Sequence, residues 1–258
     1  MESLSVLKIG GNVIDSPPVL EAVLRDFASW QGFKILVHGG GKIANKLMEQ
    51  LGIVPKMVEG RRITDHETLD VVTMVYGGLI NKNIVASLQS LSCNAIGLTG
   101  ADANIIPATK RPVNDIDYGF VGDVMPDYIS KNTLAGLVKT GLVPVMAPIT
   151  HDCKGKLLNT NADTIASGVA IALAKMFRVQ LIFCFEKKGV LRDPNDDNSV
   201  IEFLNEALYN QYKSDGIITS GMIPKLDNAF AALHNGVYEV RICSHNGFEE
   251  GTRIMVNG

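Results

Sequence analysis

The chain has 258 residues, enough for one large α/β unit or two lobes, and its 46% hydrophobic and 20% charged residues are ordinary for a folded protein. The formal net charge of −3 and the dispersed lysines argue against nucleic acid as the main partner. Four widely spaced cysteines favour reduced thiols over disulfides or zinc. The longest apolar stretch is far shorter than a membrane span and the chain opens directly in a strand, so we expect a cytoplasmic protein without a membrane partner.

The beginning of the chain alternates strands and helices. Residues 4–9 predict a strand, and a helix follows with Ser16 as its N-cap and Pro17 at its first position. Residues 33–41 predict a second strand that ends in glycines, and residues 42–51 predict a second helix. This β-α-β-α order predicts a mostly parallel sheet that is covered on both faces by helices.

Further along, residues 57–64 are polar and contain a glycine, which predicts a short hairpin or flap. Residues 65–91 predict a long helix with apolar residues on more than one face, and one use of such a helix is a subunit interface. Residues 161–176 predict a nearly uncharged interior helix. The other predicted elements are strands at 94–100, 141–149, 179–185, 238–244 and 251–256, a loop at 186–199, and a loop and helix within 221–236.

Two glycine-rich turns follow the first two predicted strands. Gly10 and Gly11 come after the strand that carries Lys8, and residues 39–41 are all glycine. Because the carboxyl ends of parallel strands meet at one edge of a sheet, both turns can present backbone N–H groups to the same anionic ligand. Either turn alone could be an ordinary tight turn, but the two together with Lys8 predict an anion site. His38 precedes the second turn and is expected to be structural.

The second turn partly matches two known glycine motifs. A Walker A loop is excluded, since Ile43 follows Gly41-Lys42 and Leu36 stands at the position of its first glycine. A dinucleotide-binding fingerprint matches Gly39, Gly41 and Ala44, which keeps an NAD-dependent oxidoreductase as an alternative. That fingerprint leaves the first turn unexplained.

Other polar residues stand in apolar surroundings. Asn159, Asn161 and Asp163 lie between a short strand and the uncharged helix, where an N-cap explains one of them but not the set. Lys225 lies near the start of a helix, where a cation is unfavourable unless it is solvated or an anion holds it. Arg62 belongs either to a solvated pair with its neighbour or to a clamp for a carboxylate.

Six segments spread over nearly the whole chain resemble the amino acid kinase family, in the family's order: "LKIGGNVI", "LVHGGGKIAN", "GRRIT", "LLNTNADTIA", "GMIPKLDNA" and "GTRI". The resemblance implies an α/β fold, an open three-layer αβα sandwich with a central, mostly parallel sheet and two lobes. Residues 1–176 would bind an acylated amino acid and dimerise, and residues 177–258 would bind ATP. Within the family, "GRRIT" and "NTNAD" favour the members that act on N-acetyl-L-glutamate over glutamate 5-kinases and carbamate kinases.

The resemblance also implies roles for individual residues. Lys8 and Lys225 would be the catalytic cations, and Asp163 would orient them. The acylated amino acid would be held by Gly40, Gly41, Arg62 and Asn159, and the nucleotide by Gly10, Gly11, Glu186, Gly189, Leu191, Ile217, Ile218 and Thr219. Gly41 would also contact the phosphates. Glu186 stands where the family usually has Asp, and two lysines follow it, which leaves the adenine and ribose contacts open.

The implied reaction is ATP-dependent phosphorylation of the side-chain carboxylate of N-acetyl-L-glutamate to N-acetyl-L-glutamyl 5-phosphate, an early step of arginine biosynthesis. That carboxylate is ionised at neutral pH, with a reference pKa of about 4.3, and needs no general base. Two lysines, Mg²⁺ carried by ATP and backbone N–H groups would neutralise the transferring group. A larger acyl group such as N-succinyl and a non-catalytic amino acid sensor remain alternatives. Since the chain begins at its first strand, we expect an arginine-insensitive homodimer.

Overall fold

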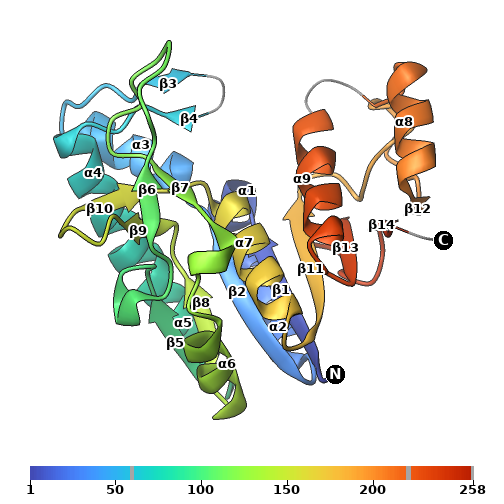
Figure 1. Cartoon of the computed structure of the whole chain (residues 1–258), viewed down its shortest axis with the longest axis horizontal. Coiled ribbons are helices and arrows are strands. Elements are labelled where there is room, and N and C mark those ends of the chain that lie inside the picture. Colours follow the sequence, from blue (N-terminus) through green and yellow to red (C-terminus); the bar gives the residue numbers. More distant parts are fainter. Residues whose placement is uncertain (59–60, 219–221, 257–258) are drawn as a thin grey trace.

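The computed structural model describes residues 1–58, 61–218 and 222–256. Its centre is an eight-stranded sheet (Figure 1). The strands lie side by side in the order β12 (Phe203–Leu204), β14 (Thr252–Ile254), β13 (Glu239–Ser244), β11 (Arg178–Phe185), β1 (Ser3–Ile9), β2 (Phe33–His38), β8 (Val143–Met146) and β5 (Ala95–Leu98). Every neighbouring pair is parallel except β13 with β14, so the predicted mostly parallel sheet is confirmed.

Helices cover both faces of this sheet and make three layers, as expected. One face is covered by α6 (Lys131–Lys139), α7 (Ala162–Ala174) and α9 (Ile223–His234) (Figure 1). On the opposite face lie α1 (Gly11–Ile14), α2 (Pro17–Ser29), α3 (Gly41–Gln50), α4 (His66–Val72) and α5 (Asn81–Ser90). α8 (Glu206–Ser214) packs through stacked rings of Tyr209 and Phe230 against α9.

The order of the strands creates a crevice. On one side of β1 lie β2, β8 and β5, in this spatial order, and on the other side lie β11, β13, β14 and β12. In open α/β sheets, ligands bind outside the carboxyl ends of strands where the strand order reverses in this way. The carboxyl ends of β1 and β11 are therefore the place where the topology itself predicts a site.

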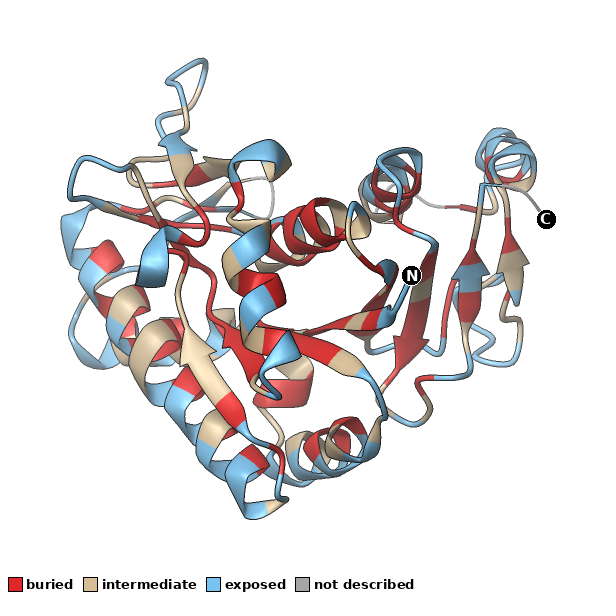
Figure 2. Ribbon diagram, turned by 60° about the horizontal axis from the view of Figure 1, so that its bottom comes forward, coloured by how far each residue is buried: buried red, intermediate tan, exposed pale blue. Residues whose placement is uncertain are grey.

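Period-two alternation along β1 divides its side chains between two cores. Leu4 and Val6 pack with the buried face of α7, while Leu7 and Ile9 pack toward α2. In Figure 2 the buried residues follow the central strands and the inner faces of the helices. The apolar sequence of α7 is explained by its place between the sheet, α6 and α9.

Three small hairpins lie outside the main sheet. They pair β3 (Met57–Val58) with β4 (Arg61–Arg62), β6 (Ala108–Lys110) with β7 (Gly122–Val124), and β9 (Ile149–His151) with β10 (Leu157–Asn159). The first hairpin confirms the flap predicted at 57–64. The single strand predicted at 141–149 is wrong, because β8 ends at Met146 and the chain continues into the separate strand β9 after Pro148.

The long helix predicted at 65–91 is present in three consecutive parts. Asp65 caps α4 by accepting the Thr68 N–H, the π-helical segment η1 (Thr73–Ile80) follows, and α5 completes the run. By length and composition, His66–Ser90 could cross a membrane, as the core helices of folded proteins also can. Here α5 packs on α2, β5 and β8, and 44% of the most apolar window is buried within the fold.

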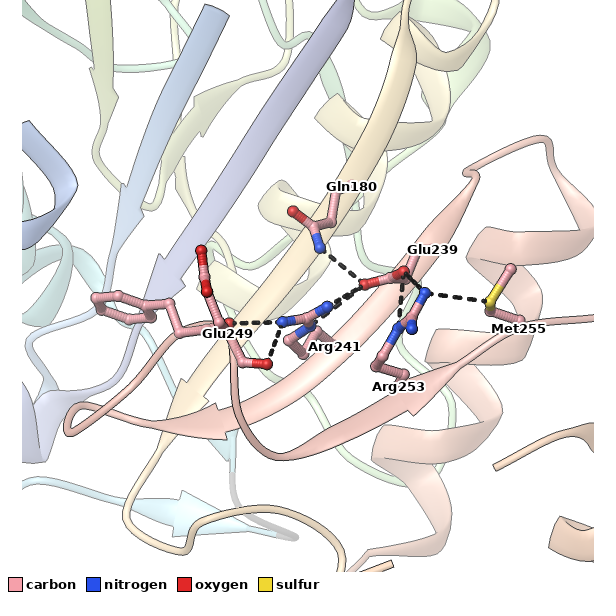
Figure 3. Close-up of polar contacts among 7 residues, drawn as sticks. Gln180, Glu239, Arg241, Glu249, Arg253 and Met255 are labelled. Carbon is pink, nitrogen blue, oxygen red and sulfur yellow. Dashed lines mark hydrogen bonds and ion pairs between the residues drawn. The ribbon is translucent and has the colours of Figure 1, made fainter. Parts of the chain in front are cut away.

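A buried carboxylate joins three strands near the amino ends of β11 and β13, at the edge of the sheet opposite the crevice (Figure 3). Glu239 of β13 accepts hydrogen bonds from Gln180 of β11, Arg241 of β13 and Arg253 of β14, each at 2.8 Å. Burial alone would raise the pKa of Glu239, but these hydrogen bonds outweigh it and hold the pKa below its usual value. This network ties β11 to the strands beyond it.

Candidate active site

Lys8 lies near the carboxyl end of β1 and is only 7% exposed. Strand alternation places it on the same face as Val6, the face that α7 covers. Asp163 stands in the first turn of α7, and its Oδ1 lies 2.8 Å from Lys8 Nζ. Because a buried unpaired ammonium is unfavourable, this ion pair stabilises the lysine at the strand end.

Lys225 reaches the same place from α9, in which it is the third residue. Its Nζ lies 4.0 Å from the centre of the Phe185 ring, and Lys8 Nζ lies 5.1 Å from the same centre. Burial lowers the pKa of Lys225, the negative charge of Asp163 opposes that change, and the positive charge of Lys8 adds to it. Two lysines far apart in the sequence therefore converge at the crevice between β1 and β11.

The two glycine turns lie side by side, as the sequence predicted. Parallel pairing sets Ile9 opposite His38, and the Gly39 N–H donates to the Ile9 carbonyl at 3.1 Å. The turns open into α1 and α3, whose first residues are Gly11 and Gly41.

Two cavities adjoin these turns. One of about 520 Å³ is lined by Lys8, Gly10, Gly11, Gly41, Glu186, Gly189 and Lys225, among others. A second of about 210 Å³ is lined by Gly39, Gly40, Gly41, Arg62, Tyr76, Asn159 and further residues. Gly41 belongs to both linings, so the cavities meet at the first residue of α3, close to the lysines.

Gly40 adopts a conformation that other residues rarely reach. Its φ is +146°, and a Cβ at this position would clash with Ile80 and lie 3.4 Å from the Tyr76 ring. Both contacting residues come from the π-helical segment η1, a type of helix that is frequent at functional sites. Segment η1 therefore fixes the space in which the glycine turn lies.

The smaller cavity combines positive charge with amide groups. Arg62 is 7% exposed, and its Nη2 donates to the Gly41 carbonyl at 3.1 Å. Asn159 Nδ2 donates to Thr64 Oγ1 at 3.0 Å, which orients the amide in the wall. Burial raises the pKa of Tyr76 beside Arg62 and keeps its phenol neutral. Such a cavity can accept a small carboxylate through a guanidinium and backbone N–H groups.

Three predicted nucleotide residues are not among those that line the larger cavity within the described part of the chain. Leu191 forms an isolated bridge with Val200, Ile218 is buried, and Ile217 is partly buried against the same core. Thr219 lies outside the described residues. Glu186 and Gly189 do line the cavity.

Several lining residues were not predicted from the sequence. Phe185 ends a buried strand and looked like ordinary core, and Arg111 lies in a segment to which no element was assigned. Lys42 carries a visible signal, because a cation directly after a glycine turn is well placed to meet an anion. It contacts Asn12 Oδ1, and its Nζ lies 3.5 Å from Asp15 Oδ2.

Comparison with known proteins shows the family of the chain. A profile described as "Amino acid kinase family" matches residues 3–244. The chain belongs to the amino acid kinase family. Relatives named acetylglutamate kinase include one from Bacteroides thetaiotaomicron, which is 57% identical over 98% of both chains. Another, from Phocaeicola vulgatus, is 55% identical over 99% of this chain and 98% of the relative. The solved structure of smu.665 from Streptococcus mutans has a TM-score of 0.78 at 29% identity, and the match covers 98% of this chain and 99% of that chain.

Proposed function

We propose that this protein transfers the γ-phosphoryl group of ATP to the side-chain carboxylate of N-acetyl-L-glutamate, an early step of arginine biosynthesis. The bond between the γ-phosphorus and the β–γ bridging oxygen breaks, a bond from that phosphorus to a carboxylate oxygen forms, and the products are ADP and N-acetyl-L-glutamyl 5-phosphate. The observation that carries the proposal is the junction of two cavities at Gly41, beside Lys8, Asp163 and Lys225. The names of the relatives at 55% and 57% identity support the acetylated substrate.

The chemistry requires charge neutralisation rather than a base. The acceptor carboxylate is ionised at neutral pH, so the difficulty is to bring it against an anionic triphosphate. Lys8 acts between the acceptor and the γ-phosphate, and Lys225 acts toward the β–γ bridge. Asp163 orients the Lys8 ammonium through their 2.8 Å ion pair. Preorganised donors of this kind stabilise the charge that develops in the transition state.

Each cavity takes one substrate. In the smaller one, Arg62 and Asn159 hold the acylated amino acid together with the N–H groups of Gly40 and Gly41. In the larger one, Gly10 and Gly11 approach the phosphates, and Glu186 and Gly189 lie farther along the nucleotide. The predicted contacts of Leu191, Ile217, Ile218 and Thr219 stay predictions for the bound state.

Mg²⁺ arrives with the nucleotide phosphates. Among the described residues, no group of three or more His, Cys, Asp or Glu side chains is placed to hold a metal ion. Magnesium commonly binds through substrate phosphates and water with few protein ligands, so the lysine-rich cavity suits a metal–nucleotide complex.

The wider organisation follows from the same assignment. Residues 1–176 form the lobe for the acylated amino acid, and residues 177–258 form the nucleotide lobe. Met74 and Leu79 of η1 are 55% and 53% exposed, which supports a homodimer through the face of the long helix that carries them. We place the enzyme in the cytoplasm, where ATP is available.

Acyl-phosphate trapping with hydroxylamine tests the proposal directly. ADP release and hydroxamate formation are measured with N-acetylglutamate, N-succinylglutamate and free glutamate. We expect hydroxamate to form with N-acetylglutamate, at a kcat/KM much higher than with either of the other two acceptors. Preference for another acceptor would overturn the substrate assignment, and binding without ADP release would indicate a sensor.

Variants separate the roles of the charged residues. Lys8→Ala and Lys225→Ala should each lower kcat by about a hundredfold with small changes in KM, because each removes a donor that acts in the transition state. Arg62→Ala should mainly raise the KM for the acceptor. Lys46→Ala, an exposed lysine on α3, is the matched control and should leave both constants unchanged.

A further inference from the structure

His38 is a buried polar residue that the proposed mechanism does not use. It is the last residue of β2, directly before the glycine turn, and it has no measurable exposure. Its Nδ1 lies 2.8 Å from the Gly39 carbonyl oxygen, and its Nε2 lies 3.2 Å from Asn81 Nδ2. Both ring nitrogens therefore have partners, although no water reaches the ring.

The partners of Asn81 decide which ring nitrogen carries the proton. Asn81 Nδ2 donates to the Val145 carbonyl at 2.9 Å, and Asn81 Oδ1 accepts from Lys82 Nζ at 3.2 Å. A carbonyl oxygen only accepts, so the amide nitrogen must face Val145, and its second hydrogen points at His38 Nε2. Nε2 is then the acceptor, and Nδ1 carries the proton that is donated to the Gly39 oxygen.

Burial keeps the His38 ring in the neutral state that this assignment requires. It lowers the pKa of His38 to about 4, against a smaller opposing effect of the hydrogen bond to Gly39. The ring is therefore neutral at physiological pH and has one donor and one acceptor. A second proton on Nε2 would face the Asn81 amide hydrogens.

The Asn81 side chain is closely surrounded by residues of neighbouring elements. Asn81 is 1% exposed and begins α5, directly after η1, whose Ile80 packs against Gly40. A Cβ on Gly97 of β5 would clash with Asn81 Oδ1, and Lys82 also donates to the Gly97 carbonyl at 3.0 Å. The amide of Asn81 is thus held by neighbouring elements on both sides.

We propose that neutral His38, held in one tautomer by Asn81, is a positioning residue that orients the Gly39–Gly40 peptide for binding of the acceptor. In a planar trans peptide the C=O and N–H point in opposite directions. Because the Gly39 oxygen is held toward the buried ring, the Gly40 N–H is turned away from it, toward the side of the smaller cavity that Gly40 lines. No hydrogen-bond acceptor for this N–H is found in residues 1–58, 61–218 or 222–256, so it is free for a substrate oxygen.

Two substitutions separate positioning from simple packing. The amide nitrogen of His38→Asn can take the place of Nδ1 and donate to Gly39, whereas the longer His38→Gln side chain reaches the place of Nε2. This test rests on the proposed function, since the acceptor is N-acetylglutamate. We expect His38→Gln to lower kcat/KM for N-acetylglutamate by about tenfold, the effect of one lost hydrogen bond, with the KM for ATP unchanged. His38→Asn should stay within about threefold of the wild type.

Leu88→Ala is the matched control for lost stability. Leu88 lies in α5, as Asn81 does, and is fully buried, but it does not line either cavity. It should lower the melting temperature without a change in either KM. Equal losses in His38→Asn and His38→Gln, or a loss that follows melting temperature across all three variants, would overturn the proposal.

Nitrogen-15 NMR of the histidine rings gives a readout that does not depend on activity. Long-range proton–nitrogen correlations should show His38 with the proton on Nδ1 at neutral pH, and the signal is assigned by its absence in His38→Asn. A proton on Nε2 would overturn the inference even if the kinase activity is as proposed. An enzyme inactive on N-acetylglutamate would overturn the proposed function and leave the tautomer result valid.

Discussion

The burial of His38 makes the stability of the fold depend on pH in a way that can be calculated. The pKa of this ring is about 4 in the folded protein, against 6.5 for an unperturbed histidine. Below pH 6.5 the unfolded chain takes up a proton that the folded protein refuses, so stability is complete at high pH and falls as the pH is lowered. At about pH 5 the loss amounts to roughly 2 kcal/mol, and it approaches roughly 3 kcal/mol at about pH 4.

The measurement compares wild type with His38→Asn, which cannot titrate at this position. The free energy of unfolding in urea is determined for both proteins at about pH 7.5 and about pH 5. On acidification from about pH 7.5 to about pH 5, the free energy of unfolding of the wild type should fall by about 2 kcal/mol more than that of the variant. This comparison does not depend on how far the two proteins differ at the higher pH. All other titrating groups are common to both proteins and cancel in the comparison. Equal losses in the two proteins would refute the reasoning, because His38 would then be protonated without penalty in the fold.

Three further predictions concern other parts of the molecule. Gly40→Ala should raise the KM for the acceptor and destabilise the fold by at least about 1 kcal/mol, because the added methyl clashes with Ile80; unchanged kinetics would show that η1 can move aside. Glu239→Gln should lower the free energy of unfolding by about 3 kcal/mol at neutral pH and by less at about pH 3, because the pKa of Glu239 is below its usual value and the stability that its charge contributes declines as the pH falls through that pKa; urea titrations at both pH values measure this, and a loss independent of pH contradicts it. Lys225 should react with an amine-selective acylating reagent faster than the exposed Lys46 does, since burial lowers its pKa, and mass spectrometry should show that ATP protects it; equal labelling rates would contradict the lowered pKa.

The sequence was informative about the fold wherever a local pattern decided the structure. Alternating strands and helices predicted the parallel sheet, and the glycines after two strands predicted two turns at one edge. Residues 141–149 form an uninterrupted apolar run, yet the chain leaves the sheet after Met146, because Pro148 has no N–H to donate to the strand ladder. Helix α8 and the β6–β7 hairpin were not predicted, since α8 has only nine, mostly polar, residues and each strand of the hairpin has three.

The candidate site was predictable to a different extent for each type of residue. Lys8 and Asp163 carry signals, a cation in an apolar strand and a carboxylate at a helix start, and the structure places them 2.8 Å apart. Lys34 was missed, although it is buried and its Nζ donates to three carbonyls at the end of α2, between 2.7 and 2.9 Å. Asn81 was missed because its partners His38 and Val145 lie 43 and 64 residues away in the sequence, while the partners of Lys34 are backbone carbonyls that become available only where α2 ends. A pattern within one segment cannot reveal them.

Phe185 has a consequence for the enzyme between catalytic cycles. Its ring offers an electron-rich face to both ammonium groups, and such an attraction is worth on the order of 1 kcal/mol. It adds to the attraction that the Asp163 carboxylate exerts on Lys8 at 2.8 Å, and it is far less than either lysine gains from an anionic oxygen. Lys8 is held mainly by Asp163, so an incoming triphosphate can draw Lys225 away from the ring without first breaking a strong interaction.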